Sequence, residues 1–176
     1  MENIIEIKER KELLKMVDDL IERPDKIKSS ILLKNHWVAL PMESGSHFDE
    51  KQAEKIAEAL SALKVKIVYA IQSELWDNSE LEIYKFIPTK EEILNFSANS
   101  RSSYFVLFSK ELSFLIVCSV YDFFVVAGTK EFVTKSSGND LEASRKQFLN
   151  FAQDSYWDND DKAQFMKVYN YYIDFG

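Results

Sequence analysis

The most apolar stretch of the chain, residues 104 to 128, limits the folds open to it more than any other feature. It reads YFVLFSKELSFLIVCSVYDFFVVAG, and charged residues at 110, 111 and 122 interrupt it. No piece of it therefore reaches the roughly 20 consecutive apolar residues that a membrane-spanning helix needs. The pieces between the interruptions have strand length and are rich in Val, Ile, Phe and Tyr, which favour β-strands. They are Tyr104–Phe108, Phe114–Ser119 and Phe123–Ala127. The stretch predicts a three-stranded antiparallel meander at about 104–127.

The middle strand of this meander is apolar on both faces. Side chains alternate across a strand, so Phe114, Ile116 and Cys118 share one face and Leu115 and Val117 share the other. A sheet that is apolar on both sides must be covered on both sides. We therefore expect the meander to lie at the centre of a core, with helices packed on it.

The remainder of the chain carries helix and strand patterns in an irregular order. Asp49 with Gln52, and Thr89 with Glu92, fit capping boxes at helix starts. Pro41 places the end of an extended segment at a sheet edge or a turn. The expected helices are 2–22, 49–63, 89 to about 95, 130–135, 140–153 and 158–173, and the other expected strands are 30–42, 65–71 and 80–87.

This order of elements predicts the fold class. Strands that follow one another without regular helical crossovers favour an α+β fold over a doubly wound α/β fold. We predict one α+β domain over residues 1–176, with a mainly antiparallel central sheet packed by helices. Its N-terminal helix is expected at about 2–22 and its C-terminal helices at about 140–173.

The net charge of −7 bears on the kind of partner that the protein can bind. Nucleic acids and anionic membrane surfaces attract Lys and Arg, so an acidic chain argues against both. A basic protein partner would suit the charge better, although many proteins are mildly acidic for solubility alone. One cysteine rules out an internal disulfide framework, and the N-terminal MENIIEIKERKELLK lacks the apolar segment of a signal peptide. These features predict a cytoplasmic protein.

The sequence offers few candidates for catalysis, and each has a simpler structural explanation. His36 and His47 are eleven residues apart with no cysteine nearby, which does not match zinc-ligand spacing. His36 is expected to pack within a strand, and Cys118 to behave as a small buried hydrophobe. The run DNDD, Asp158–Asp161, does not fit a calcium loop and is expected to cap a helix. We predict no catalytic residue, no metal and no cofactor, with an unrecognised carboxylate pair as the alternative.

Two acidic segments that contain aromatic residues stand out as candidate binding surfaces. Residues 74–100 hold six acids and two lysines, a net charge of −4, and residues 154–176 hold five acids and two lysines, a net charge of −3. Tryptophan is enriched at binding hot spots, and carboxylates around it favour Arg and Lys. The alternative is a solvated acidic face whose aromatic side chains pack back on the core. The predicted partner-binding residues are Glu74, Trp76, Asp77, Glu80, Trp157, Asp158, Asp160 and Asp161.

The meander and the residues after it, YFVLFSKELSFLIVCSVYDFFVVAGTKEFV, resemble a pattern found in small, acidic bacterial immunity proteins of polymorphic-toxin and contact-dependent inhibition systems. The resemblance covers about thirty residues, 104–133, and carries over no functional residue. It implies a cytoplasmic inhibitor that neutralises one cognate toxin, usually by blocking its active site. Toxins that attack nucleic acids tend to be basic, which would suit the negative charge. Two alternatives stay open: a structural or regulatory interaction domain without catalysis, and an enzyme with a carboxylate site.

Overall fold

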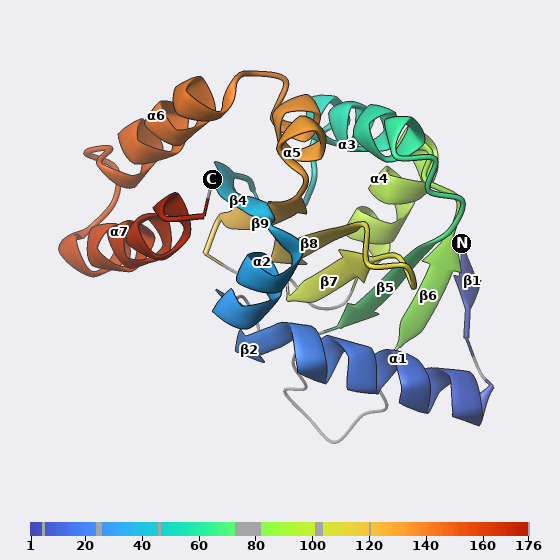
Figure 1. The fold of residues 1–176 in the computed structure, drawn as a ribbon. Helices are drawn as coiled ribbons and strands as arrows, with labels where there is room; N and C mark the ends of the chain where they lie inside the picture. The colour runs from blue at the N-terminus through green and yellow to red at the C-terminus, as the bar shows by residue number, and fades with distance from the viewer. Residues whose placement is uncertain are drawn as a thin grey trace.

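The protein has an α+β fold, as the order of elements predicts (Figure 1). The structure is a computed structural model, and it describes residues 1–4, 6–23, 26–45, 47–72, 82–100, 104–119 and 121–175. In chain order, the elements of these ranges are β1 (Glu2–Asn3), α1 (Ile7–Leu20), β2 (Ile21–Arg23), β3 (Lys26–Ile27), α2 (Ser29–Asn35), β4 (Val38–Glu43), α3 (Glu50–Ala62), β5 (Val68–Gln72), β6 (Ile83–Phe86), α4 (Lys90–Asn99), β7 (Phe105–Phe108), β8 (Phe114–Cys118), β9 (Phe123–Gly128), α5 (Lys130–Ser137), α6 (Leu141–Ala152) and α7 (Asn159–Ile173).

In the described residues, the central sheet has seven strands in the order β1-β6-β5-β7-β8-β9-β4, and every neighbouring pair is antiparallel. The predicted meander is confirmed as β7, β8 and β9, which lie inside the sheet between β5 and β4. Ile116 of β8 is paired with Leu107 on one side and Val126 on the other. Strands β2 and β3 form a separate two-stranded sheet.

Both faces of the sheet are covered, as the two-faced apolar pattern predicts. Phe114, Ile116 and Cys118 belong to one buried cluster, which also contains side chains of α3, α4 and α5. Leu115 and Val117 belong to a second cluster, which contains side chains of α1, α2, α6 and α7. Figure 1 shows α3, α4 and α5 on one side of the sheet and α1 and α2 on the other, with α6 and α7 beside β4. The result is three layers, with the meander in the middle one.

The outer edge of β4 is protected against pairing with another strand. The N–H of Ala39 donates to the carbonyl of Phe175 at 3.4 Å, so alternate residues of β4 point their backbone groups outward. Pro41 is one of these residues and has no N–H, which fits the predicted edge position. The carbonyl of Glu43 accepts from Nε2 of Gln52 at 2.8 Å. These contacts occupy two of the outward backbone groups of β4, and Pro41 offers no N–H, which together make the edge a poorer template for another strand.

The prediction of an extended segment over residues 30–42 is wrong for residues 30–35. The chain forms helix α2 there, and His36 adopts the left-handed conformation (φ 51°, ψ 42°) that ends it. The N–H groups of His36 and Trp37 donate to the carbonyls of Leu33 and Leu32, a Schellman motif. His36 is therefore an exposed helix-ending residue, not a packed strand residue. Glycine or asparagine usually marks this position, and neither is present.

The N-terminal helix is shorter than the predicted 2–22 at both ends, because it begins at Ile7 and ends at Leu20, and Ile21–Arg23 form β2. The carboxylate of Glu6 accepts from the N–H groups of Lys8 and Glu9 and caps the helix. Glu2 and Asn3 pair instead with β6. The capping box of Asp49 and Gln52 at the start of α3 is confirmed.

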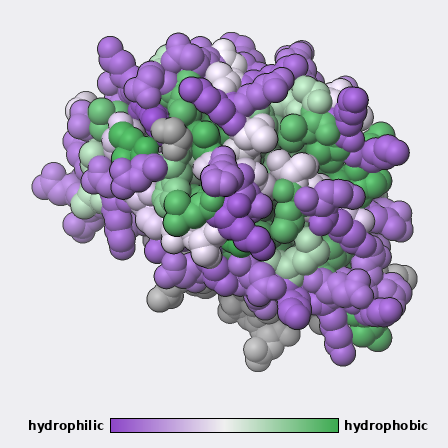
Figure 2. Space-filling model, in the orientation of Figure 1, coloured by the Kyte–Doolittle hydropathy of each residue, from purple (hydrophilic) through white to green (hydrophobic). Residues whose placement is uncertain are grey.

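The surface is mainly polar. Hydrophilic side chains dominate the face shown in Figure 2, and apolar ones lie in smaller patches between them. Within the described ranges, no helix combines the length and the apolar character needed to cross a bilayer. The exposed large apolar side chains that the structure describes are scattered, two on helices and five outside the helices and strands: Ile7, Leu33, Met1, Ile67, Ile87, Tyr121 and Tyr156.

Candidate protein-interaction site

The candidate site is the turn between α6 and α7 together with the first residues of α7. We call residues 153–161 the α6–α7 corner. It contains four of the eight predicted partner-binding residues: Trp157, Asp158, Asp160 and Asp161. The other four, Glu74, Trp76, Asp77 and Glu80, lie outside the described residues.

The two helices that carry the corner are tied to the rest of the fold. Arg145 of α6 is 8% exposed, and its Nη2 donates to the carbonyl of Ile173 at the end of α7 at 3.0 Å. The hydroxyl of Tyr172 accepts from the N–H of Ile27 at 2.9 Å, which joins α7 to β3. Buried polar contacts of this kind hold an element in one orientation. These two hydrogen bonds fix α6 and α7, which carry the corner, relative to each other and to β3.

Asp158 begins α7 as its N-cap. One carboxylate oxygen accepts from the N–H groups of Asp160 and Asp161, each at 2.9 Å. A cap of this kind satisfies backbone donors that have no partner within the helix. The expected capping role of the DNDD run is confirmed for Asp158, and Asp160 and Asp161 follow in the first turn, where negative charge complements the helix dipole.

Replacing Asp158 with alanine should lower the free energy of unfolding by about 0.5–2 kcal/mol, the usual cost of losing an N-cap. Asp160→Ala is the matched control, because it removes a charge from the same turn but no capping hydrogen bond. Its cost should be smaller, about 0.3–1 kcal/mol. Urea unfolding of the two variants measures the difference, and a larger loss for Asp160→Ala would contradict the capping role.

Trp157 packs back on the core, as the alternative reading of the acidic segments expects. Its ring makes edge contacts with Phe151 and Phe165, at centroid distances of 5.2 Å and 5.1 Å. It is only partly exposed and borders the second buried cluster. Trp157 thus anchors the corner rather than projecting from it.

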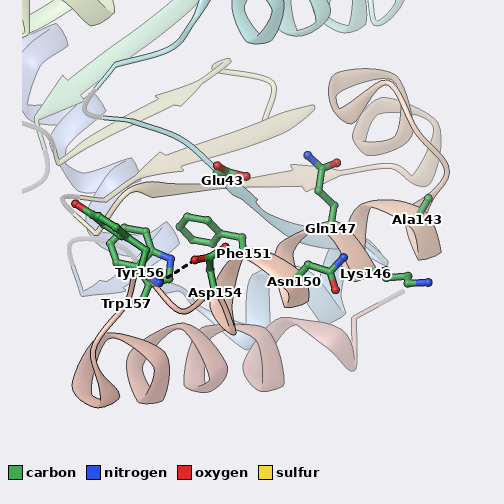
Figure 3. A pocket seen from close by; sticks show the side chains of 9 residues that line it. All are labelled: Glu43, Ala143, Lys146, Gln147, Asn150, Phe151, Asp154, Tyr156 and Trp157. Carbon is green, nitrogen blue, oxygen red and sulfur yellow. Dashed lines mark hydrogen bonds between the residues drawn. The ribbon is translucent and has the colours of Figure 1, made fainter.

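Tyr156 is the aromatic side chain that projects from the corner. It is 83% exposed, the highest value among the large apolar side chains that the structure describes. Its ring meets that of Trp157 edge to face at 4.9 Å, and its N–H donates to the Asp154 carboxylate at 2.8 Å (Figure 3). Sequence reasoning missed this residue because it ranked tryptophan first. The signal was present in SYWDND, where a second aromatic residue directly precedes the tryptophan.

A groove runs along α6 from the corner to the edge of β4. It has a volume of about 630 Å³, and Phe151 and Trp157 form part of its apolar wall. Figure 3 shows Glu43 of β4 on one side and Asp154 on the other, with Lys146 toward the end away from Trp157. A second cleft, of about 570 Å³, shares part of this wall and extends toward α3 and the end of α5.

The corner and the groove carry five carboxylates that form none of the described ion pairs. Two lysines, Lys146 and Lys162, lie in the same region. A field of unpaired charge of one sign attracts an opposite charge on a partner. The five acidic residues are Glu43, Asp154, Asp158, Asp160 and Asp161.

The strands that flank the undescribed acidic segment 73–81 end on the same side of the sheet as the groove. Across the sheet, Gln72 is in register with Phe105, then Cys118, Phe124 and finally Met42. β5 and β4 are four strand spacings apart, or about 19 Å at about 4.8 Å each. The first predicted binding segment is thus attached to the end of the sheet at which Glu43 lines the groove.

Of the residues considered for catalysis, His47 and Cys118 line the same small pocket, and His36 lies elsewhere, at the end of α2. His36 and His47 are exposed on different connections, and Cys118 is buried at 6% exposure. Burial raises the pKa of the Cys118 thiol well above its usual range, which keeps the sulfur protonated and poorly nucleophilic. Among the residues that the structure describes, no three His, Cys, Asp or Glu side chains are grouped to hold a metal ion.

Comparison of the chain with protein-family models, with curated proteins and with solved structures gives no significant match.

Proposed function

We propose that the protein is a non-catalytic binding protein that takes up a basic protein partner at the α6–α7 corner. The observation that carries the proposal is Tyr156, an almost fully exposed ring held against a partly buried tryptophan and surrounded by unpaired carboxylates. Tyrosine provides a large contact area at a low cost in side-chain entropy, and it is frequent at binding hot spots. The support from Trp157 restricts the ring before binding, which lowers the cost further.

The carboxylates of the corner have a separate role in this proposal. Asp154, Asp160 and Asp161 would attract a basic surface over a distance and then fix its orientation. Asp158 adds its charge while it caps the helix. The segment with Glu74, Trp76, Asp77 and Glu80 is the proposed second contact, because its flanking strands end on the same side of the sheet.

The specific form of the proposal is an immunity-type inhibitor. The support for it is the resemblance of residues 104–133 to immunity proteins and the suitability of an acidic face for a basic, nuclease-type toxin. Such an inhibitor acts in the cytoplasm by covering its cognate toxin. The alternative within the same class is a structural or regulatory interaction domain, whose partner has no toxic activity to suppress.

The test begins with co-purification of the partner from the native host. The association rate is then measured against salt for the wild type, for Asp160→Lys/Asp161→Lys, and for the matched control Glu54→Lys/Glu58→Lys. The control carries the same charge change on exposed residues of α3, on the other side of the sheet.

We expect the wild-type association rate to fall several-fold from low to physiological salt, because exposed charges are screened beyond about 8–10 Å there. The corner variant should associate more slowly and depend less on salt, and the control should match the wild type. A rate that ignores salt and is unchanged in both variants would contradict the proposal and leave the acidic corner with a role in solubility alone.

A further inference from the structure

The groove beside the corner has the composition of a site for one cationic side chain. Phe151 and Trp157 supply an aromatic wall, and the carboxylates of Glu43 and Asp154 lie at its sides (Figure 3). An aromatic face attracts a cation, and carboxylates accept hydrogen bonds from it. The groove thus offers a long basic side chain both aromatic contact and carboxylate acceptors.

The carboxylates of this groove are available to a ligand. The backbone carbonyl of Glu43 is taken by Gln52, and none of the described ion pairs uses its side chain. Asp154 accepts one backbone hydrogen bond, from Tyr156, which orients the carboxylate and leaves further lone pairs free. Lys146, the one cation that lines this groove, lies toward the end away from Trp157 (Figure 3).

We propose that the groove binds the side chain of one arginine of the partner protein, an inference that rests on the proposed function. The guanidinium lies against Phe151 and Trp157 and donates to the carboxylates of Glu43 and Asp154. Arginine fits better than lysine because its planar group stacks on aromatic rings, carries five donors and is more weakly hydrated.

The probe is a short peptide, acetyl-Gly-Arg-Gly-amide, compared with the same peptide carrying citrulline or lysine. Citrulline has nearly the shape of arginine without its charge. Binding is followed by NMR at the indole N–H of Trp157, which a Trp157→Phe variant assigns among the three tryptophans. The protein variants are Glu43→Gln and Asp154→Asn, with Glu58→Gln as the control.

We expect a saturable shift at Trp157, with the arginine peptide binding about tenfold more tightly than the citrulline peptide, since it adds ion pairs and cation–π contact. The lysine peptide should lie between them. Glu43→Gln and Asp154→Asn should each weaken arginine binding several-fold, and Glu58→Gln should not. Equal binding of arginine and citrulline, or no saturable shift at Trp157, would overturn the proposal.

This test and the test of the proposed function fail separately. If the arginine peptide does not bind but the Asp160/Asp161 variant still slows association, the arginine site is wrong and the corner remains the interface. If the peptide binds but the rate of partner association changes neither with salt nor in the corner variant, the arginine site in the groove is retained and the proposed function is wrong.

Discussion

Ile116→Ala and Leu115→Ala are each expected to lower the free energy of unfolding by about 2–5 kcal/mol, the range for truncating a large side chain in a packed core. The two residues are neighbours on β8, and both are 0% exposed. Ile116 points into the cluster with α3, α4 and α5, and Leu115 into the cluster with α1, α2, α6 and α7. The pair therefore tests each face of the sheet separately.

Leu33→Ala is the control for this pair, because Leu33 is 65% exposed on α2. It should change stability by no more than about 0.5 kcal/mol. Urea unfolding should show lower midpoints for the two core variants with an unchanged slope. A large loss for only one of them would mean that helices cover a single face of the sheet.

Tyr156→Ala is expected to weaken partner binding by about 2 kcal/mol or more, a factor of about 30 in the dissociation constant. The ring is exposed in the free protein, so its removal should leave the melting temperature almost unchanged. This combination separates a binding role from a structural one, which Trp157 would not, since Trp157 packs on Phe151 and Phe165.

The centre of the fold could be predicted because the sequence signals there are local. Charged residues divide the apolar stretch 104–128 into pieces of strand length, and alternation along β8 shows that both faces must be covered. Asp49 with Gln52, and Asp158 before α7, mark helix starts because their side chains bond to the adjacent turn.

The errors arise where the structure depends on contacts between distant parts of the chain or on an unusual residue. Glu2 and Asn3 form a strand because β6 offers them an edge, and no local pattern shows that edge. His36 ends α2 in the left-handed conformation. A glycine or asparagine at this position would have indicated the helix end in the sequence, and histidine does not. The strand order likewise follows from pairing over long sequence separations.

The candidate site could be located but not assigned in detail. The acidic, aromatic composition of residues 154–176 directs attention to the α6–α7 corner. Composition cannot show which of two adjacent rings is buried. That choice depends on Phe151 and Phe165, which receive Trp157 and leave Tyr156 outside. The groove is also invisible in the sequence, because β4 and α6 form it together.

The most direct test of the central claim is the affinity of the co-purified partner for Tyr156→Ala, measured beside Ile87→Ala. Ile87 is 56% exposed and follows β6 at the end of the sheet opposite Glu43, so its variant removes an exposed apolar side chain far from the corner. We predict that Tyr156→Ala raises the dissociation constant about 30-fold or more and that Ile87→Ala leaves it within about twofold. Equal affinities for both variants and the wild type would contradict the assignment of the α6–α7 corner as the binding surface.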